Sequence, residues 1–296
     1  MGNILTKQFY RQRKDFEDSC AGRDAGLTFP EGVRCSTDIA YADDGIKAHL
    51  LDIYRPEDSQ EKVLPVIINV HGGGLIIGNK EFNRYFCALL CKKGFLVYSI
   101  EYRLIPDCLI YDQLADVFMA MDYIKERLAA DGGDSSHVYM AGDSGGACLI
   151  TYANAIQNNT NIARAANVTP SGLRINALGL ISGMFYTSRF DKIGLFLPKY
   201  LYGRDYKKTP FAKYVNPENR ELLNSLAPVW LVTSHNDFLR RYTTDFEKAL
   251  TRAEREHELV VFPKNKKLTH AFSVFEPFLP ESSAVIDMMV EYLRKF

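Results

Sequence analysis

The stretch Gly142-Asp143-Ser144-Gly145-Gly146 follows a strand-like run that begins at Val138 and precedes an apolar run that begins at Ala147. It is a G-x-S-x-G pattern between a predicted strand and a predicted helix, which is typical of a nucleophile elbow. In such an elbow a sharp turn lifts the serine hydroxyl above the edge of a sheet, and glycines flank the serine because a Cβ would not fit. The helix N-terminus also offers free N–H groups that stabilise negative charge. The stretch therefore predicts an α/β fold with Ser144 as its nucleophile.

Strand-like runs rich in β-branched and aromatic residues recur on both sides of this elbow. Eight such runs occupy residues 36–42, 48–54, 63–70, 95–102, 138–142, 175–181, 228–234 and 258–262. From the third run onward they alternate with helical patterns at residues 81–93, 111–130, 146–158, 242–256 and 282–295. The alternation predicts a mostly parallel eight-stranded sheet with helices on both faces.

Two segments, residues 1–35 and 185–226, do not fit the alternation. The second is rich in aromatic residues, as a cover over an apolar pocket would be, although an extra helical layer packed on the sheet explains them equally well. No repeat, low-complexity tract or flexible linker divides the chain. We therefore expect one domain, residues 1–296, with a small cap formed by these two segments. Phe185 and Tyr186, at the start of the second segment, are our candidates for substrate contact.

A glycine-rich stretch, His71-Gly72-Gly73-Gly74, directly follows the third predicted strand. Attack on an ester carbonyl creates an oxyanion, and a glycine loop can turn several N–H groups toward it with no side chain in the way. We expect Gly73 and Gly74, together with Gly145 after the serine, to donate these N–H groups. His71 is more consistent with a hydrogen bond that shapes the loop than with catalysis.

The general base must be a histidine on a loop at the same edge of the sheet as Ser144. Of the six histidines, His270 fits best, because it follows the last predicted strand and precedes the final helix. Asp237 follows the seventh strand, where a carboxylate can hold the histidine ring in one tautomer. The chain order Ser144, Asp237, His270 is that of α/β-hydrolases. The sequence therefore predicts an α/β-hydrolase fold with a Ser-His-Asp triad.

With these residues in place, the chain resembles the hormone-sensitive-lipase-like family of esterases and lipases from about Thr37 onward. The resemblance rests on the glycine stretch, the G-x-S-x-G stretch, the aspartate and histidine loops, and Tyr102-Arg103-Leu104 with Pro106 and Asp116. It implies hydrolysis of carboxylic esters without a metal or cofactor, beneath a cap formed by the N-terminus and an insertion.

Three positions depart from the pattern of that family. Gly145 stands where alanine is usual, Arg241 where a second aspartate is usual, and Ala271 where glycine is common. The second change removes an acid from the loop of Asp237 and leaves the triad itself intact.

We therefore expect a serine carboxylesterase that hydrolyses short-chain acyl esters through a covalent acyl-enzyme. Two other functions on the same fold are weighed against it, acyl-peptide or oligopeptide hydrolysis and non-catalytic ligand reception. The first usually needs a large additional domain, and the second usually lacks a triad member. Because no extended apolar run indicates binding to a lipid interface, we expect a closed, small pocket that favours acyl chains of about two to six carbons.

The net charge of the chain limits the classes of molecule that we expect it to bind. The 36 Lys and Arg residues equal the 36 Asp and Glu residues in number, so no overall field draws the protein to nucleic acid or to an anionic membrane. No apolar run is long enough for a membrane span. We expect a small-molecule ester as partner and no nucleic acid, and the sequence leaves open whether the chain forms a homodimer.

The cysteines and the N-terminus bear on location. Six scattered cysteines form neither a disulfide framework nor a paired metal motif, which favours a cytoplasmic protein without a metal site. The N-terminus lacks the apolar core of a signal peptide. Met1-Gly2 with Thr6 matches the loose pattern for N-myristoylation, and whether Gly2 is lipidated stays open.

Overall fold

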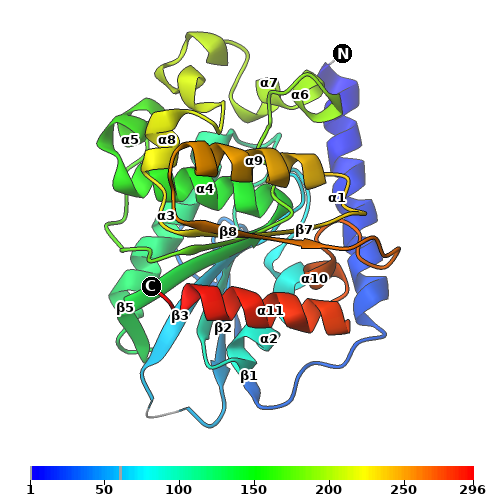
Figure 1. Ribbon diagram of the computed structural model, residues 1–296, viewed down its shortest axis with the longest axis vertical. Helices are drawn as coiled ribbons and strands as arrows, with labels where there is room; N and C mark the ends of the chain where they lie inside the picture. The colour runs from blue at the N-terminus through cyan, green and yellow to red at the C-terminus, as the bar shows by residue number, and fades with distance from the viewer. Residues whose placement is uncertain (1, 60–61) are drawn as a thin grey trace.

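A single eight-stranded sheet runs through the computed structural model, which describes residues 2–59 and 62–296 (Figure 1). The strands are β1 (Val33–Ala40), β2 (Leu50–Pro56), β3 (Leu64–Val70), β4 (Leu96–Ile100), β5 (Gly133–Asp143), β6 (Leu178–Ile181), β7 (Val229–Ser234) and β8 (His257–Phe262). Their order across the sheet is β1-β2-β4-β3-β5-β6-β7-β8. β2 runs antiparallel to β1 and β4, and all other neighbours pair in parallel. The predicted mostly parallel sheet is confirmed.

The central strands are buried on both faces, so their side chains alternate between two apolar cores. In β5, Val138 and Met140 belong to one core, whereas Tyr139 and Ala141 belong to the other. This double burial explains why these strands read as nearly continuous apolar runs in the sequence.

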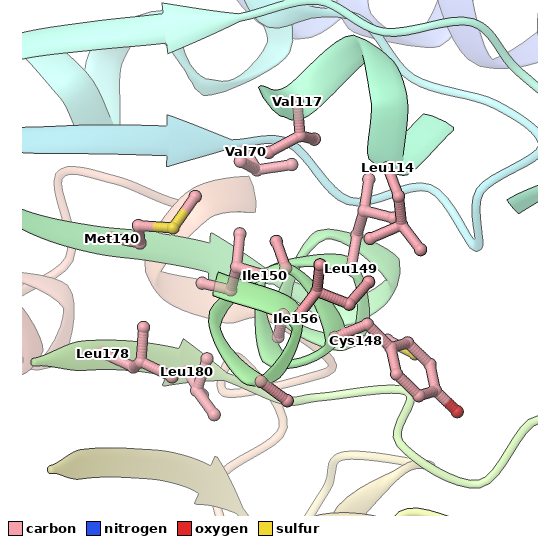
Figure 2. Packing of buried hydrophobic residues seen from close by; sticks show 14 of the residues in the cluster. Val70, Leu114, Val117, Met140, Cys148, Leu149, Ile150, Ile156, Leu178 and Leu180 are labelled. Carbon is pink, nitrogen blue, oxygen red and sulfur yellow. The ribbon is translucent and has the colours of Figure 1, made fainter. Parts of the chain in front are cut away.

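Helices cover both faces. The first core lies under α3 (Ile110–Arg127), α4 (Ser144–Asn158), α5 (Thr160–Ala166) and α9 (Arg240–Arg252). Figure 2 shows this packing, with Met140 of β5 and Leu178 of β6 near Ile150 of α4. The second core lies under η1 (Lys80–Asn83), α2 (Arg84–Lys92), α10 (Phe272–Phe275) and α11 (Pro280–Leu293). The long helices follow the predicted ones, and α5 and α10 were not predicted.

The main addition to the predicted helices is α1 (Gly2–Asp24), a long helix in the segment that we expected to form part of the cap. Only a narrow stripe of its side chains packs against the protein, including Phe9, Phe16 and Cys20, and most of its other side chains face solvent. A stripe that narrow gives little periodic signal, so packing on the domain rather than sequence pattern stabilises this helix. Met1, part of the myristoylation pattern, lies outside the described residues.

Two arginines attach α1 to the domain. Arg13 pairs with Asp107 at 2.7 Å and donates to three main-chain carbonyls, those of Ile76, Leu104 and Ile105. Arg23 donates to the carbonyl of Phe82 at 2.9 Å. Hydrogen bonds from a charged donor to such carbonyls are among the stronger ones, so α1 is fixed at two points along its length.

The segment 185–226 folds into short helices. They are α6 (Lys192–Phe196), α7 (Pro198–Leu201), η2 (Tyr206–Lys208), η3 (Pro210–Tyr214) and α8 (Arg220–Asn224). In Figure 1, α6 and α7 lie at the same end of the molecule as the N-terminal end of α1. The ring of Phe9 packs edge-on against Tyr200 of α7, with ring centroids 5.2 Å apart.

Throughout residues 2–59 and 62–296, no helix has the length and apolar character needed to cross a membrane.

Candidate active site

Ser144 lies at the turn between β5 and α4 with φ of +49°, a left-handed conformation that a side chain rarely adopts. The flanking glycines explain how the turn is held. A Cβ added at Gly142 would lie 2.9 Å from the carbonyl oxygen of Val70, and one at Gly146 would lie 2.1 Å from the same oxygen. The turn therefore packs directly against the end of β3, as the G-x-S-x-G pattern predicted.

The structure brings Ser144, His270 and Asp237 together from three separate loops. The Oγ of Ser144 lies 2.9 Å from Nε2 of His270, and Nδ1 of the same ring lies 2.7 Å from Oδ1 of Asp237. If Nδ1–H donates to the carboxylate, Nε2 is left to accept the proton of the serine hydroxyl. This is the geometry that nucleophilic attack by a serine requires.

Asp237 is almost fully buried, and each of its oxygens is satisfied. Oδ2 accepts from the hydroxyl of Thr233 at 2.8 Å, and Oδ1 accepts from the N–H of Leu239 at 2.8 Å as well as from His270. Burial by itself would raise the pKa of Asp237, but the hydrogen bond and positive charge of His270 hold that pKa below its usual value. The carboxylate therefore stays ionised and fixes the ring of His270.

The glycine loop lies directly against the elbow. Gly73 and Gly74 have φ of +102° and +61°, and a Cβ at Gly73 would lie 2.0 Å from the carbonyl oxygen of Ile77. Gly145 is as tightly placed, because a Cβ there would lie 2.9 Å from the nitrogen of Gly74. Within the described residues, no hydrogen bond uses the N–H of Gly73, Gly74 or Gly145. Three free donors thus meet beside Ser144, which is what an oxyanion hole requires.

Asp143, the residue before the serine in the elbow, connects the elbow to the glycine loop. Its Oδ1 accepts from the N–H of Gly72 at 3.0 Å and from the side-chain amide of Asn83 at 2.9 Å. Complete burial raises the pKa of this carboxyl above its usual value. The contact aligns the glycine loop with the turn that carries the serine.

His71 is fully buried beneath the loop and outside the triad. Its Nε2 lies 2.9 Å from Oε1 of Glu101, its Nδ1 lies 2.8 Å from the carbonyl oxygen of Gly72, and its ring stacks on Tyr102 at 4.4 Å. Burial alone would lower the pKa of His71, but Glu101 raises it above the usual value. The contacts at both ring nitrogens and the stacking on Tyr102 shape the loop, in agreement with the predicted structural role.

Ser144 opens into an apolar cavity of about 600 Å³. Its wall includes Phe9, Phe16, Phe82, Phe275, Phe196 and Phe238, from segments far apart in the sequence. The ring of Phe82 contacts Phe16 and Phe275, with centroids 4.8 and 4.7 Å away, so three of these rings form one aromatic side. We expected a closed pocket, but Phe196 and Phe238 are exposed, so the cavity is open where they lie.

The prediction that Phe185 and Tyr186 contact substrate is wrong for the cavity of Ser144, because neither residue lines it. Phe185 is buried and stacks on Phe246 of α9 with ring centroids 4.2 Å apart. The hydroxyl of Tyr186 donates to Glu218 at 2.8 Å. These aromatic rings lie against α9 and serve packing, which is the alternative that composition had left open.

The lining residues that the sequence analysis missed include three from α1. Phe9 and Phe16 are seven residues apart, and Gln12, which also lines the cavity, lies between them on the same helical face. That spacing was the available signal, but it has meaning only once residues 2–24 are known to be a helix that lies over the serine.

Comparisons with known proteins agree with this geometry. A family model described as alpha/beta hydrolase fold matches residues 67–273. A probable isoprenylcysteine alpha-carbonyl methylesterase of Oryza sativa subsp. japonica is 29% identical over 184 residues, which cover 58% of this chain and 44% of that protein. Esterase LipC of Mycobacterium tuberculosis is 31% identical over 122 residues, 41% of this chain and 30% of that protein. The chain thus spans less than half the length of these relatives.

Solved structures extend the likeness to the whole chain. Esterase B from Lactobacillus Rhamnosis superposes with a TM-score of 0.92 at 21% identity, covering 100% of this chain and 96% of that one. A hyperthermophilic esterase of the archaeon Pyrobaculum calidifontis has a TM-score of 0.72 at 22% identity, covering 97% and 93%. At these identities the likeness shows the fold. Because the family model spans more than half of the chain, from Ile67 within β3 to Ser273 just after His270, the chain belongs to the alpha/beta hydrolase fold family, in its hormone-sensitive-lipase-like branch.

Proposed function

We propose that this protein is a serine carboxylesterase that hydrolyses short-chain acyl esters beneath a cap formed by residues 1–35 and 185–226. One observation carries the proposal: the hydrogen-bonded series from Ser144 through His270 to Asp237 opens into an apolar cavity beside three free N–H donors. The named relatives are esterases, which supports ester hydrolysis over other reactions of the fold.

The reaction follows from the atoms of the site. Nε2 of His270 takes the proton of Ser144 as Oγ attacks the carbonyl carbon of the ester, and the new oxyanion accepts hydrogen bonds from Gly73, Gly74 and Gly145. His270 then gives the proton to the leaving alcohol, which leaves an acyl-enzyme. Water, activated by the same nitrogen, hydrolyses that ester and frees Ser144. Asp237 stabilises the imidazolium that forms in both steps.

The cavity supports a substrate of modest size. Its volume of about 600 Å³ falls within the range of roughly 300–1,000 Å³ for small-molecule sites, and it must hold both the acyl and the alcohol part. The ring of Phe82, fixed between Phe16 and Phe275, limits how far a chain can extend on that side. Each further methylene adds about 0.8 kcal/mol of binding only where apolar surface remains to receive it.

The test is the specificity constant for p-nitrophenyl esters of increasing acyl length, with a methyl ester added because relatives are named methylesterases. We expect a maximum at about two to six carbons and a decline beyond it. A maximum at palmitate would contradict the short-chain preference while leaving the esterase proposal intact.

The two other functions give different outcomes. A fluorophosphonate probe should label Ser144 of the wild type and not of Ser144→Ala, and absence of labelling would favour a non-catalytic receptor. A higher specificity constant on aminoacyl arylamides than on simple esters would instead favour peptide hydrolysis.

A further inference from the structure

Several large apolar side chains that line the cavity, or lie within a few residues of its lining in the sequence, are exposed to solvent. Phe190 is 92% exposed, Phe238 is 75% exposed, and Leu195 and Phe196 are each 55% exposed. Phe196 and Phe238 line the cavity itself, and the ring of Phe238 lies 4.4 Å from that of His270. Large apolar side chains that are exposed beside a cavity are typical of an interaction site on a folded protein.

The backbone below Phe190 is held in place, so its exposure is not the result of a loose loop. Arg189 pairs with Asp245 at 2.8 Å and stacks over Tyr186 at 3.7 Å. Asp191 caps α6 and accepts a hydrogen bond from the hydroxyl of Tyr242. Polar contacts on both sides of Phe190 therefore direct its ring outward, and none of the five residues of α6 is buried.

The same end of the molecule is strongly basic, although the whole chain is neutral. Residues 2–14 contain four Lys and Arg and no Asp or Glu, and residues 185–214 contain seven Lys and Arg and two Asp. Exposed cations in these segments include Lys7, Arg11, Lys14, Lys192, Lys199 and Arg204. The expectation that no overall field draws this protein to an anionic surface rests on the total charge, which does not show the excess of basic residues in these two segments.

We propose that this face, formed by the first half of α1, by residues 185–214 and by Phe238, docks on an anionic lipid surface. The basic side chains match anionic headgroups, and Phe190, Leu195, Phe196 and Phe238 reach the boundary between headgroups and acyl chains. Docking in this way turns the mouth of the cavity toward the lipid, so that an amphiphilic ester passes to Ser144 without crossing water. The docking itself does not depend on whether Ser144 hydrolyses esters.

The experiment is co-sedimentation of the full chain with vesicles of phosphatidylcholine alone or of phosphatidylcholine with phosphatidylserine. We expect binding to the anionic vesicles and much weaker binding to the neutral ones. Phe190→Ser with Leu195→Ser should reduce the vesicle affinity at least tenfold, since buried apolar side chains contribute strongly. Lys7→Glu with Lys199→Glu should reduce it more, because each basic residue near such a surface accounts for about fivefold.

Matched controls lie at the other end of the parallel strands. Val63, 69% exposed at the start of β3, and its neighbour Lys62 supply Val63→Ser and Lys62→Glu, which should bind like the wild type. All variants should keep the wild-type melting temperature and the wild-type rate on a water-soluble ester, which separates loss of docking from loss of folding or catalysis. Equal binding to both kinds of vesicle, no binding to either, or equal affinity of cap-face and control variants would overturn the proposal. Absence of vesicle binding would point to an acidic protein as the partner of this face.

Discussion

The glycine loop and the elbow are held in place differently from the two segments that lie above them, α1 and residues 185–214. In the loop and elbow, main chains approach so closely that a Cβ at Gly73 or Gly146 would lie 2.0 or 2.1 Å from a carbonyl oxygen. α1 and residues 185–214 are instead held by side-chain contacts, such as those of Arg13 and Arg189, and residues 185–214 leave Phe190, Leu195 and Phe196 exposed to solvent. The reacting atoms therefore depend on fixed backbone geometry, whereas access to them depends on surface contacts that can vary.

The largest expected effect comes from removing the reacting groups of the fixed region. Ser144→Ala or His270→Ala should reduce kcat by about 10⁶-fold, and the double variant should lose little more, because these groups act as a unit. Asp237→Asn should cost less, about 10⁴-fold, by leaving the ring in the wrong tautomer. Ester hydrolysis and circular dichroism would measure activity and folding separately. Near-full activity of Asp237→Asn would mean that another carboxylate orients His270.

A substitution that adds one methyl group tests how tightly the elbow is packed. Gly146→Ala places a Cβ against the main chain of β3 and should lower the free energy of unfolding by about 3 kcal/mol or more. Gly22→Ala, on the exposed side of α1 with no atom within 4 Å of the new Cβ, should stabilise the protein by about 0.5–1 kcal/mol. Urea unfolding of both variants compares the regions directly. Similar changes in the free energy of unfolding for Gly146→Ala and Gly22→Ala would contradict the proposed difference in packing between the elbow and α1.

An intermediate effect is expected where α1 is attached. Arg13→Gln removes the pair with Asp107 and weakens three hydrogen bonds to carbonyls, so α1 should separate more readily and KM should rise several-fold with little change in kcat. Arg11→Gln is the matched control, since Arg11 is exposed and its ion pair with Asp15, at 3.7 Å, lies within α1 itself. Steady-state kinetics on one short-chain ester measures both. Equal KM values for the two variants would show that the Arg13 contacts do not hold α1 over the cavity.

The smallest effect concerns Glu221, which joins two short helices of the segment 185–226. A hydrogen bond from Tyr214, with further ones from Asn161 and Lys213, lowers the pKa of Glu221 to about 2. Because the folded value lies below the unfolded value of about 4.3, the stabilisation is complete above that pH and is lost as the pH falls toward 2. Glu221→Gln should therefore cost less than about 1 kcal/mol at neutral pH, since the group is close to solvent.

Urea midpoints of the wild type and Glu221→Gln, at neutral pH and near pH 3, provide the measurement. The difference between the two proteins should shrink at the lower pH. A wild type that is less stable than Glu221→Gln at neutral pH, and that gains stability relative to this variant as the pH falls, would mean that the carboxylate opposes folding.

The sequence by itself determined the sheet and pointed to the residues that we propose react. Eight strands, the main helices, and the order of Ser144, Asp237 and His270 follow from local patterns, because glycines at a positive φ and apolar runs of fixed period leave the backbone few choices. The parallel sheet then carries the three loops to one edge, so residues from three motifs could be grouped before any distance was known.

The sequence predicted which two segments cover that edge, but tertiary structure alone decided which of their side chains line the cavity. Phe185 and Tyr186 turned out to pack against α9 or bond to Glu218, whereas Phe9 and Phe16 of an unpredicted helix reached the cavity. The basic residues of α1 and of residues 185–214 act together only because folding places these distant segments at one end of a neutral chain. Local pattern specifies backbone conformation, but the destination of a surface side chain depends on contacts between segments that no local pattern contains.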